Sequence, residues 1–92
     1  MTFSHSKDRI FLEGENHKVL AFVSFPPEGD GVVNAKHTYV DPSLRGQGVG
    51  DKLMLALIDE LKKNGKKVKP TCPFVVKWFE RHSEYASFLA ES

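Results

Sequence analysis

An arginine and three glycines lie together in this chain, between an apolar run that ends at Val40 and a helical pattern that begins near Val49. Residues 45–50 read Arg-Gly-Gln-Gly-Val-Gly. The first amides of a helix have no acceptor inside the helix, and the helix dipole places partial positive charge on them. A strand that turns through glycines into a helix N-terminus therefore builds an anion site. The sequence predicts that residues 45–50 bind a phosphate group, in the form of a pyrophosphate.

Length and composition are typical of one small globular domain over residues 1–92. A chain of this size buries only about 60–65% of its unfolded surface, so its core is modest. The formal net charge of +1 gives little attraction to nucleic acid. No apolar run approaches the roughly 20 residues that span a bilayer, and the first residues lack the apolar core of a signal peptide.

The chain holds a single cysteine, Cys72, and therefore no intrachain disulfide, which is typical of a cytoplasmic protein. We expect a cytoplasmic monomer or weak homodimer that binds neither nucleic acid nor membrane. Five lysines follow the helical pattern: Lys62, Lys63, Lys66, Lys67 and Lys69. Solvation of a helix C-terminus explains such a cluster, and a phosphate contact is the alternative.

Three runs rich in β-branched and aromatic residues precede the glycines and predict strands, at residues 9–14, 18–25 and 32–40. The first two are close enough in sequence to pair as an antiparallel hairpin. In the third, alternation places Val33, Ala35, His37 and Tyr39 on one face. Polar groups occur on both faces of this strand, which indicates that one face meets solvent or a ligand.

A helix and a further strand follow the glycines. Apolar residues at i, i+4 spacing predict the helix over 49–63, and Asn64-Gly65 ends it. Residues 67–72 are expected to form a strand, so that strand, helix and strand make a βαβ unit with strands three and four parallel. Pro70 places strand four at an edge, or splayed from its neighbour.

The last part of the chain returns to a helical pattern from Phe74 to about Arg81. This pattern places Val75, Val76 and Phe79 inward and leaves the orientation of Trp78 open. Ser83 is expected to cap a final short helix. The order β-β-β-α-β-α predicts a small α+β protein built of mixed α/β layers.

Residues 45–50 match the Arg/Gln-x-x-Gly-x-Gly/Ala signature of the GNAT superfamily of N-acetyltransferases. The preceding residues 40–44, Val-Asp-Pro-Ser-Leu, resemble the lead-in that this family places between a strand and a long helix. The chain is most similar to the short, single-domain GNAT-like acetyltransferases, and the resemblance covers nearly its whole length. His37-Thr38, residues 69–75 and residues 82–85 support it. The resemblance implies a minimal GNAT-like fold and acetyl-coenzyme A (acetyl-CoA) as cofactor.

The resemblance also implies where coenzyme A (CoA) would lie. Its pantetheine arm would run between splayed strands three and four, with the thioester carbonyl near the backbone of Thr38, Tyr39 and Val40. Its pyrophosphate would lie on the amides of the glycine loop: Arg45, Gly46, Gln47, Gly48, Val49 and Gly50. The implied reaction moves an acetyl group to a primary amine of unidentified kind.

Two departures from the family pattern bear on catalysis. Larger members carry two helices between their first strands, which build much of the acceptor site, whereas only residues 14–17 separate these strands here. The acceptor site is therefore expected to be open. Larger members also carry Asn-x-x-Ala-x-x-x-Tyr after the fourth of these strands, and alignment puts Cys72 at the Asn and Phe79 at the Tyr. A phenyl ring cannot donate a proton, so the usual general acid is absent.

Cys72 and His37 are the candidates that remain for catalysis. The first amides of the last helix would lower the pKa of the Cys72 thiol from about 8.5. Cys72 can protonate the departing thiolate, or take the acetyl group itself as a thioester, and a small buried residue is the alternative. His37, with an ordinary pKa near 6.5, is the expected general base. The alternative is a histidine that pairs with a carboxylate or a backbone group.

His82 is expected to have a structural role, and the sequence predicts no metal site. Two other functions remain open. An acetyl-CoA-binding module with weak or lost catalysis is favoured by the absent Tyr and the absent acceptor helices. A generic nucleotide-phosphate site ranks last, because the loop lacks the Gly-Lys-Ser/Thr ending of a P-loop.

Overall fold

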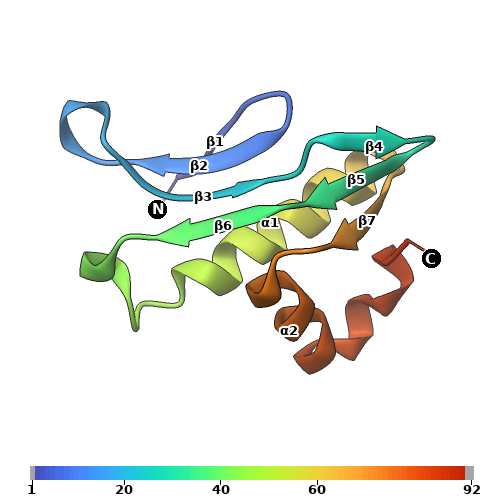
Figure 1. The fold of residues 1–92 in the computed structure, drawn as a ribbon. Helices are drawn as coiled ribbons and strands as arrows, with labels where there is room; N and C mark the ends of the chain where they lie inside the picture. Colours follow the sequence, from blue (N-terminus) through green and yellow to red (C-terminus); the bar gives the residue numbers. More distant parts are fainter. Residues whose placement is uncertain (1, 91–92) are drawn as a thin grey trace.

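Two small β-sheets and two α-helices make up the fold (Figure 1). The computed structural model describes residues 2–90. One sheet has the strand order β1-β2-β3-β6 and the other β4-β5-β7. The elements are β1 (Ser4–His5), β2 (Arg9–Glu13), η1 (Glu15–His17), β3 (Val19–Ser24), β4 (Pro27–Gly29), β5 (Val32–Ala35), β6 (His37–Val40), η2 (Pro42–Leu44), α1 (Val49–Asn64), β7 (Lys67–Pro70), α2 (Pro73–Arg81) and η3 (Ser83–Phe88).

The expected hairpin of the first two long strands is confirmed. β2 and β3 pair antiparallel, with Ile10 opposite Val23 and Phe11 opposite Phe22. β6 then pairs antiparallel with the other side of β3. β6 is the outer strand of this sheet, and its second side has no strand partner among residues 2–90.

The third strand, expected to run unbroken over residues 32–40, is divided at Lys36. The amide of Lys36 donates to the carbonyl of Ser24 at 3.0 Å, while His37 is the register partner of that same Ser24. Two residues of one strand therefore face one residue of the other, which is a β-bulge. β5 joins one sheet and β6 the other, so the bulge lies where the two sheets meet.

The bulge corrects the predicted faces of this strand. Val33 and Ala35 are buried as expected, but His37 and Tyr39 are exposed rather than on the same face as them. Beyond Lys36 it is instead Thr38 and Val40 that turn inward, because their cross-strand partners on β3 are fully buried. Side chains of a strand alternate between its two faces. One extra residue reverses this alternation, so every later side chain changes face.

The expected parallel pairing of strands three and four is confirmed for β5 and β7, from Val32 opposite Lys67 to Ala35 opposite Pro70. The pairing ends at Pro70, in keeping with its predicted position on an edge strand. Beyond this point β6 continues along β3 while the chain after β7 enters α2. The two strands therefore diverge, as the splayed arrangement required, and we call the opening between them the fork.

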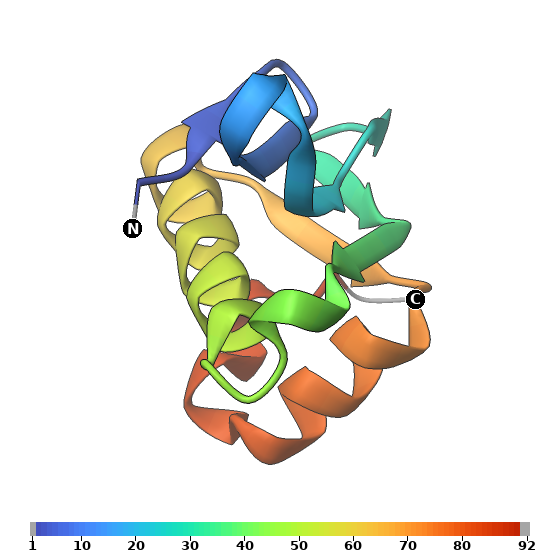
Figure 2. The ribbon, with the colours of Figure 1, turned by 90° about the vertical axis from the view of Figure 1, so that its left-hand side faces the viewer.

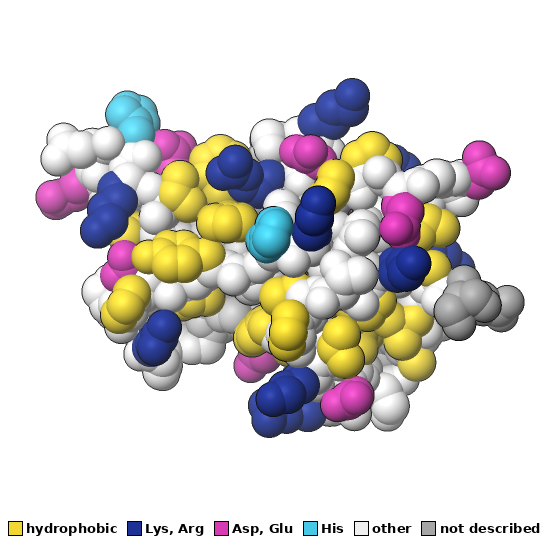
Figure 3. Space-filling view, in the orientation of Figure 1, with side chains coloured by type: hydrophobic (Ala, Val, Ile, Leu, Met, Phe, Trp, Pro, Cys, Tyr) yellow, Lys and Arg dark blue, Asp and Glu magenta, His cyan; other side chains and the backbone are white. Residues whose placement is uncertain are grey.

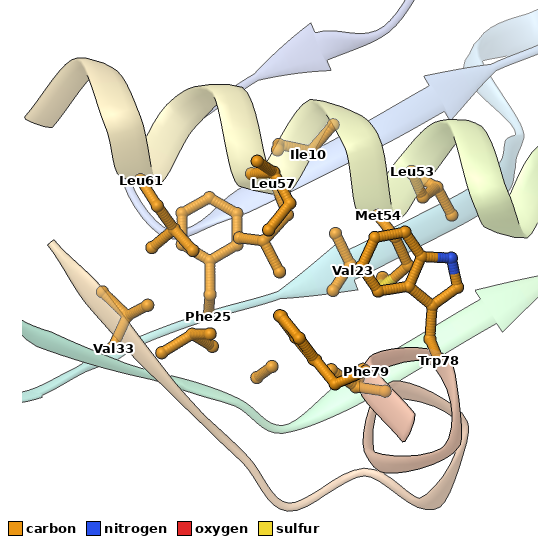
Figure 4. Close-up of a cluster of buried hydrophobic side chains, with 14 of the residues drawn as sticks. Ile10, Val23, Phe25, Val33, Leu53, Met54, Leu57, Leu61, Trp78 and Phe79 are labelled. Atoms are coloured by element: carbon orange, nitrogen blue, oxygen red, sulfur yellow. The ribbon is translucent and has the colours of Figure 1, made fainter. Parts of the chain in front are cut away.

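The hydrophobic core lies between α1 and the inner faces of the sheets (Figure 4). Ile10, Val23 and Phe25 from the strands face the apolar stripe of α1, and Trp78 and Phe79 close the cluster from α2. The buried α1 side chains are Val49, Leu53, Met54, Leu57, Ile58 and Leu61. The stripe predicted from i, i+4 spacing is confirmed, and Gly65 in the left-handed region ends the helix as expected (φ 63°).

Two expectations for the C-terminal part are wrong. Val76 is 36% exposed, and Trp78 takes the buried position instead, because α2 turns its Val75-Trp78-Phe79 face toward α1. After Ser83 the chain forms a 3-10 helix, with His82 at its cap position and no side-chain cap hydrogen bond, so Ser83 does not cap it. No helix within residues 2–90 combines the length and the apolar character needed to cross a membrane.

The core position of α1 predicts a sharp contrast between two of its leucines. Leu57 is fully buried, whereas Leu55 on the opposite side of the helix is 46% exposed. Leu57→Ala should lower the free energy of unfolding by about 2–5 kcal/mol, because it removes buried methyl groups and leaves a cavity. Leu55→Ala should change it by about 0.5 kcal/mol or less. Urea unfolding of both variants measures the difference, and equal effects would contradict this placement of α1.

Candidate functional site

The loop between β6 and α1 takes its shape from two glycines. Gly46 and Gly48 have φ angles of +83° and +73°, a left-handed conformation that residues with a side chain rarely adopt. Gly48 is the N-cap residue of α1, so no side chain bonds the first amides of the helix. The sequence thus places flexible backbone, rather than a capping side chain, at the positive end of the helix dipole.

Several amides of this loop are free to meet a ligand. The first helical bond runs from the amide of Lys52 to the carbonyl of Gly48 at 3.1 Å, so the amides of residues 48–51 precede any intrahelical acceptor. The amides of Arg45 and Gln47 differ from our expectation. They donate, at 3.3 Å each, to the carbonyls of Pro42 and Leu44 within the loop. The amides at Gly46 and at 48–50 therefore form the candidate anion site.

Asp41 anchors the start of the loop. One of its carboxylate oxygens accepts from the amide of Ser43 at 3.0 Å and from the Ser43 hydroxyl at 2.8 Å. The other accepts from the Tyr39 hydroxyl at 3.2 Å and lies 3.7 Å from the Lys18 ammonium. The hydrogen bonds from Ser43 lower the pKa of Asp41 from 3.8 to about 2. Desolvation, followed by the hydrogen bond to Asp41, raises the pKa of Tyr39.

Asp41 is a site residue whose role the sequence analysis missed. It was treated only as part of a lead-in that resembles the family. The signal was present in Asp-Pro-Ser, because an Asp before a turn commonly accepts from the amide two residues later. Its effect here is to hold η2, and through it the glycine loop, in one conformation.

Gly50 and Asp51 join the glycine loop to α2. A Cβ on Gly50 would lie 2.7 Å from Cζ of Phe74, so the absence of a side chain lets the Phe74 ring approach the first turn of α1. The indole Nε1 of Trp78 donates to Oδ1 of Asp51 at 3.0 Å. These two contacts hold the first turn of α1 beside α2. The glycine loop is therefore connected to both sides of the fork, to β6 along the chain and to α2 through these contacts.

The fork brings the predicted catalytic positions to one place. The carbonyl of Ala35 accepts from the amides of both Thr71 and Cys72, at 3.1 Å each. Cys72, the N-cap residue of α2, is thus bonded to the chain two residues before His37. The Cys72 side chain is half-buried and makes no cap hydrogen bond. His37 and Cys72 therefore stand on the two sides of the same opening.

His37 and Thr38 have no hydrogen-bonding partners for their side chains among residues 2–90. His37 is exposed, so the alternative in which it pairs with a carboxylate or backbone group finds no support in the structure. The hydroxyl oxygen of Thr38 is buried and unpartnered. An unpaired buried hydroxyl costs free energy and is uncommon in native proteins.

The remaining predicted site residues have different surroundings. Val49 is buried in the core, so only its backbone can meet a ligand, and Val40 packs against the core as well. His82 has the structural role expected of it. Its Nδ1 lies 2.8 Å from the carbonyl of Trp78, and its ring stacks on the indole at 4.1 Å. Within residues 2–90 no group of His, Cys, Asp and Glu could hold a metal ion.

α1 lies on one side of the β1-β2-β3-β6 sheet (Figure 2). On the opposite face Tyr39 lies 6.0 Å from Phe22 between ring centroids, and Arg9 stands over the Phe22 ring at 5.2 Å. Hydrophobic side chains show at the surface over this sheet (Figure 3). The connection between β2 and β3 is only the short η1, so no helix of residues 2–90 covers this face next to His37. Within the described residues this face of the sheet is therefore open, and whether an acceptor binds there stays a prediction.

Comparison with known proteins identifies the family. The chain matches the model of the GCN5-related N-acetyltransferase family over residues 9–88. It belongs to this family, and the predicted enzyme class, N-acetyl transfer, is confirmed at the level of the family. A comparison with curated protein sequences finds no match.

Solved structures confirm the fold. A GCN5-like protein from Staphylococcus aureus superimposes with a TM-score of 0.82 at 23% identity, and the match covers 99% of this chain and 89% of that one. The N-acetylglutamate synthase of Neisseria gonorrhoeae, solved with coenzyme A and N-acetyl-glutamate, gives a TM-score of 0.65 at 15% identity. That match covers 86% of this chain but only 21% of the larger enzyme. The minimal GNAT-like fold is therefore confirmed.

The Asp41 hydrogen bonds predict a pH dependence of stability. Because the pKa of Asp41 is about 2 in the folded chain and 3.8 is its ordinary value, folding favours the ionised carboxylate. Its contribution is fully present above pH 3.8 and is lost as the pH falls through about 2. Asp41→Asn should therefore lack this part of the acid-induced loss of stability. Urea unfolding between these pH values measures it, with Asp59→Asn, an exposed carboxylate on α1, as control.

If the unfolding free energy of Asp41→Asn and of the parent chain decline in parallel over this pH window, the anchoring role of Asp41 is refuted. A parallel decline in the Asp59→Asn control is the expected result, because Asp59 makes no side-chain hydrogen bond within residues 2–90.

Proposed function

We propose that residues 1–92 form a single acetyltransferase domain that moves an acetyl group from acetyl-CoA to a primary amine. The observation that supports the proposal is that the two parts of the candidate site lie at the two ends of one strand, β6. An uncapped helix N-terminus with a glycine backbone lies at one end of β6, and an unpaired Thr38 hydroxyl, Cys72 and His37 lie at the other. An elongated ligand with a phosphate at one end and a reactive group at the other fits this arrangement.

The residues present suit coenzyme A. The amides of Gly46 and of 48–50 would hold the pyrophosphate, because they are free and lie at the positive end of the α1 dipole. The backbone edge of β6, which has no strand partner within residues 2–90, would bond the amides of the pantetheine arm. When bound, acetyl-CoA supplies an acyl group already activated as a thioester.

His37 is proposed as the general base. An amine attacks a carbonyl only in its neutral form, so a group at the site must take its proton. His37 is exposed on the side of the sheet that no helix covers, has no partner of its own, and follows the bulge at the fork. An acceptor that arrives over Tyr39 and Phe22 would present its amine to this imidazole.

Cys72 is proposed as the group that discharges the leaving thiolate. The Tyr that larger family members use corresponds to Phe79, which is buried in the core and has no proton to give. Cys72 lies at the fork and carries an S–H proton. It would either donate that proton to the departing sulfur, or give it to the coenzyme A thiolate that leaves as the Cys72 sulfur takes the acetyl group from the thioester. In the second case the amine would attack the S–acetyl bond, the amide would form, and the released Cys72 thiolate would be protonated again. The amine proton goes to His37 in both cases.

A coenzyme A-binding module with weak or lost catalysis is the second candidate, favoured by Phe79 and the absent acceptor helices. Titration of acetyl-CoA with and without a panel of amines separates the two functions. Binding without any amine-dependent release of thiol would favour the module. A cytoplasmic location is part of the proposal and is supported by the single cysteine, as is action as a monomer or weak homodimer.

The role of Cys72 is tested by intact-mass measurement after incubation with acetyl-CoA. A covalent step predicts a gain of one acetyl group in the parent chain and none in Cys72→Ala. A gain that persists in Cys72→Ala would refute Cys72 as the acceptor. If neither chain gains mass while amines still accelerate the release of thiol, direct transfer is favoured. Cys72→Ser should then retain more activity than Cys72→Ala, because a hydroxyl can still donate a proton.

The role of His37 is tested by steady-state kinetics with the most reactive amine found in the panel. His37→Gln should lower kcat/KM by about 10²–10⁴-fold, the usual contribution of a positioned general base. It should also remove any rise of kcat/KM with pH that comes from deprotonation of the base. His17→Gln, a change to an exposed histidine in the β2–β3 connection, should leave both unchanged. An unaltered pH profile in His37→Gln would contradict its role as base.

A further inference from the structure

A row of three aromatic side chains crosses the sheet face that α1 does not cover. The strand registers place Phe11 of β2 opposite Phe22 of β3, and Phe22 opposite Tyr39 of β6. Ala21 and Val23 are fully buried in the core with α1, so Phe22 between them points to the other face. Phe11 and Phe22 are half-buried and Tyr39 is 39% exposed. The row therefore leaves an accessible aromatic surface over three neighbouring strands.

The next row along the strands carries the proposed base and a cation. Its members are Arg9 of β2, Ser24 of β3 and His37 of β6. Neighbouring strands lie about 4.8 Å apart, so Arg9 and His37 flank Ser24 with about 10 Å between their backbones. Arg9 is exposed, and its guanidinium lies 5.2 Å from the centroid of the Phe22 ring. A base, a cation and an aromatic surface therefore surround the position above Ser24.

The charges of this face favour an anionic group next to Arg9. The Arg9 side chain forms no ion pair within residues 2–90, and Lys36 is exposed beside His37. Lys and Arg side chains stand among hydrophobic ones over this sheet (Figure 3). The carboxylates of Glu13 and Asp41 lie four residues farther along the chain from this row, roughly 14 Å away. Each already has a partner, a histidine for Glu13 and a lysine with two hydroxyls for Asp41.

We propose that the acceptor is an α-amino acid with an apolar side chain and a free carboxylate, and that Arg9 determines this specificity. The inference rests on the proposed function, because it names the amine that His37 deprotonates. The α-carbon carries an amine, a carboxylate and a side chain, which one molecule above Ser24 presents to His37, Arg9 and the aromatic row. A guanidinium bonds both oxygens of a carboxylate at once. A polyamine brings only cations to this surface and fits it poorly.

An amino acid acceptor completes the transfer without another reactant. Overall, the amine nitrogen bonds the acetyl carbon and the carbon–sulfur bond to coenzyme A breaks. The coenzyme A sulfur takes the proton of Cys72, and the proton that His37 takes from the amine returns to the Cys72 thiolate. The products are an N-acetyl amino acid and the free coenzyme A thiol.

The test compares L-phenylalanine, L-phenylalaninamide and spermidine as acceptors in a thiol-release assay with the full chain and acetyl-CoA. The amide keeps the amine and the ring but has no carboxylate. Because these amines differ in intrinsic reactivity, the decisive quantity is the change on mutation of the kcat/KM ratio between L-phenylalanine and its amide. In Arg9→Met this ratio should fall about tenfold or more, as loss of a charge-assisted pair predicts, with kcat/KM for the amide unchanged. Arg9→Lys should give an intermediate ratio.

A second measurement follows binding apart from turnover. Titration of the ¹⁵N-labelled chain with L-phenylalanine should shift the amide signals of β3 and β6 around Ser24. The resulting dissociation constant should rise about tenfold or more in Arg9→Met. Phe22→Leu tests the aromatic row, and should lower the preference for L-phenylalanine over L-alanine by about threefold or more.

Lys7→Met is the matched control. Lys7 is an exposed cation two residues before Arg9, but it lies on the α1 side of the sheet, where it lines a hollow with Leu61. Its removal lowers the net charge equally and should keep the parent ratio. Far-UV circular dichroism and urea unfolding confirm that each variant is folded.

Three outcomes would overturn the inference while the proposed function stands. The first is efficient acetylation of spermidine with none of L-phenylalanine. The second is a ratio of acid to amide that persists in Arg9→Met, and the third is an equal loss in Lys7→Met, which would reduce the effect to general attraction. If no amine accelerates the release of thiol in the parent chain, the proposed function fails together with the inference.

Discussion

One extra residue opposite Ser24 creates the opening on which the site depends. The bulge at Lys36 and His37 ends the pairing of β5 with β7 and sends β6 along β3 instead. The carbonyl of Ala35, just before the bulge, holds the amides that start α2. Without the bulge β6 would continue beside the strand that leads to Cys72, and its edge would be occupied by backbone hydrogen bonds. With it, an unpaired edge, a buried hydroxyl and a thiol border one fork.

The glycine loop is held from both sides rather than by its own sequence alone. Asp41 fixes its start through Ser43, Tyr39 and Lys18. The close approach of Phe74 to Gly50, and the hydrogen bond between Trp78 and Asp51, fix its end against α2. Such support matters because backbone amides select an anion only when they are already oriented, so that binding does not have to order the loop. The glycines supply the conformation, and the neighbouring elements keep it.

Two features of the chain determine the surroundings of the proposed catalytic residues: the short β2–β3 connection and the burial of Phe79. A short connection between β2 and β3 leaves one face of the sheet uncovered by any helix of residues 2–90, and Phe79 takes a core position. The proposed chemistry is therefore assigned to His37 and Cys72 at the fork.

The sequence alone was sufficient for the glycine loop, the core helix and the order of strands and helices, which depend on local pattern. Glycine and proline positions, the i, i+4 stripe of α1 and the strand-helix-strand order predicted the loop, the core helix and the parallel pair, and these led to the family. Only the tertiary structure decided the bulge, the inward turn of Thr38, the exposure of Val76 and the use of the Arg45 and Gln47 amides within the loop. The alternation of residues along a strand does not reveal a β-bulge, because the bulge depends on how that strand pairs with its partner. Which face of a short helix is buried is likewise set by the neighbour against which it packs. The Thr38 hydroxyl becomes buried only once β6 pairs with β3.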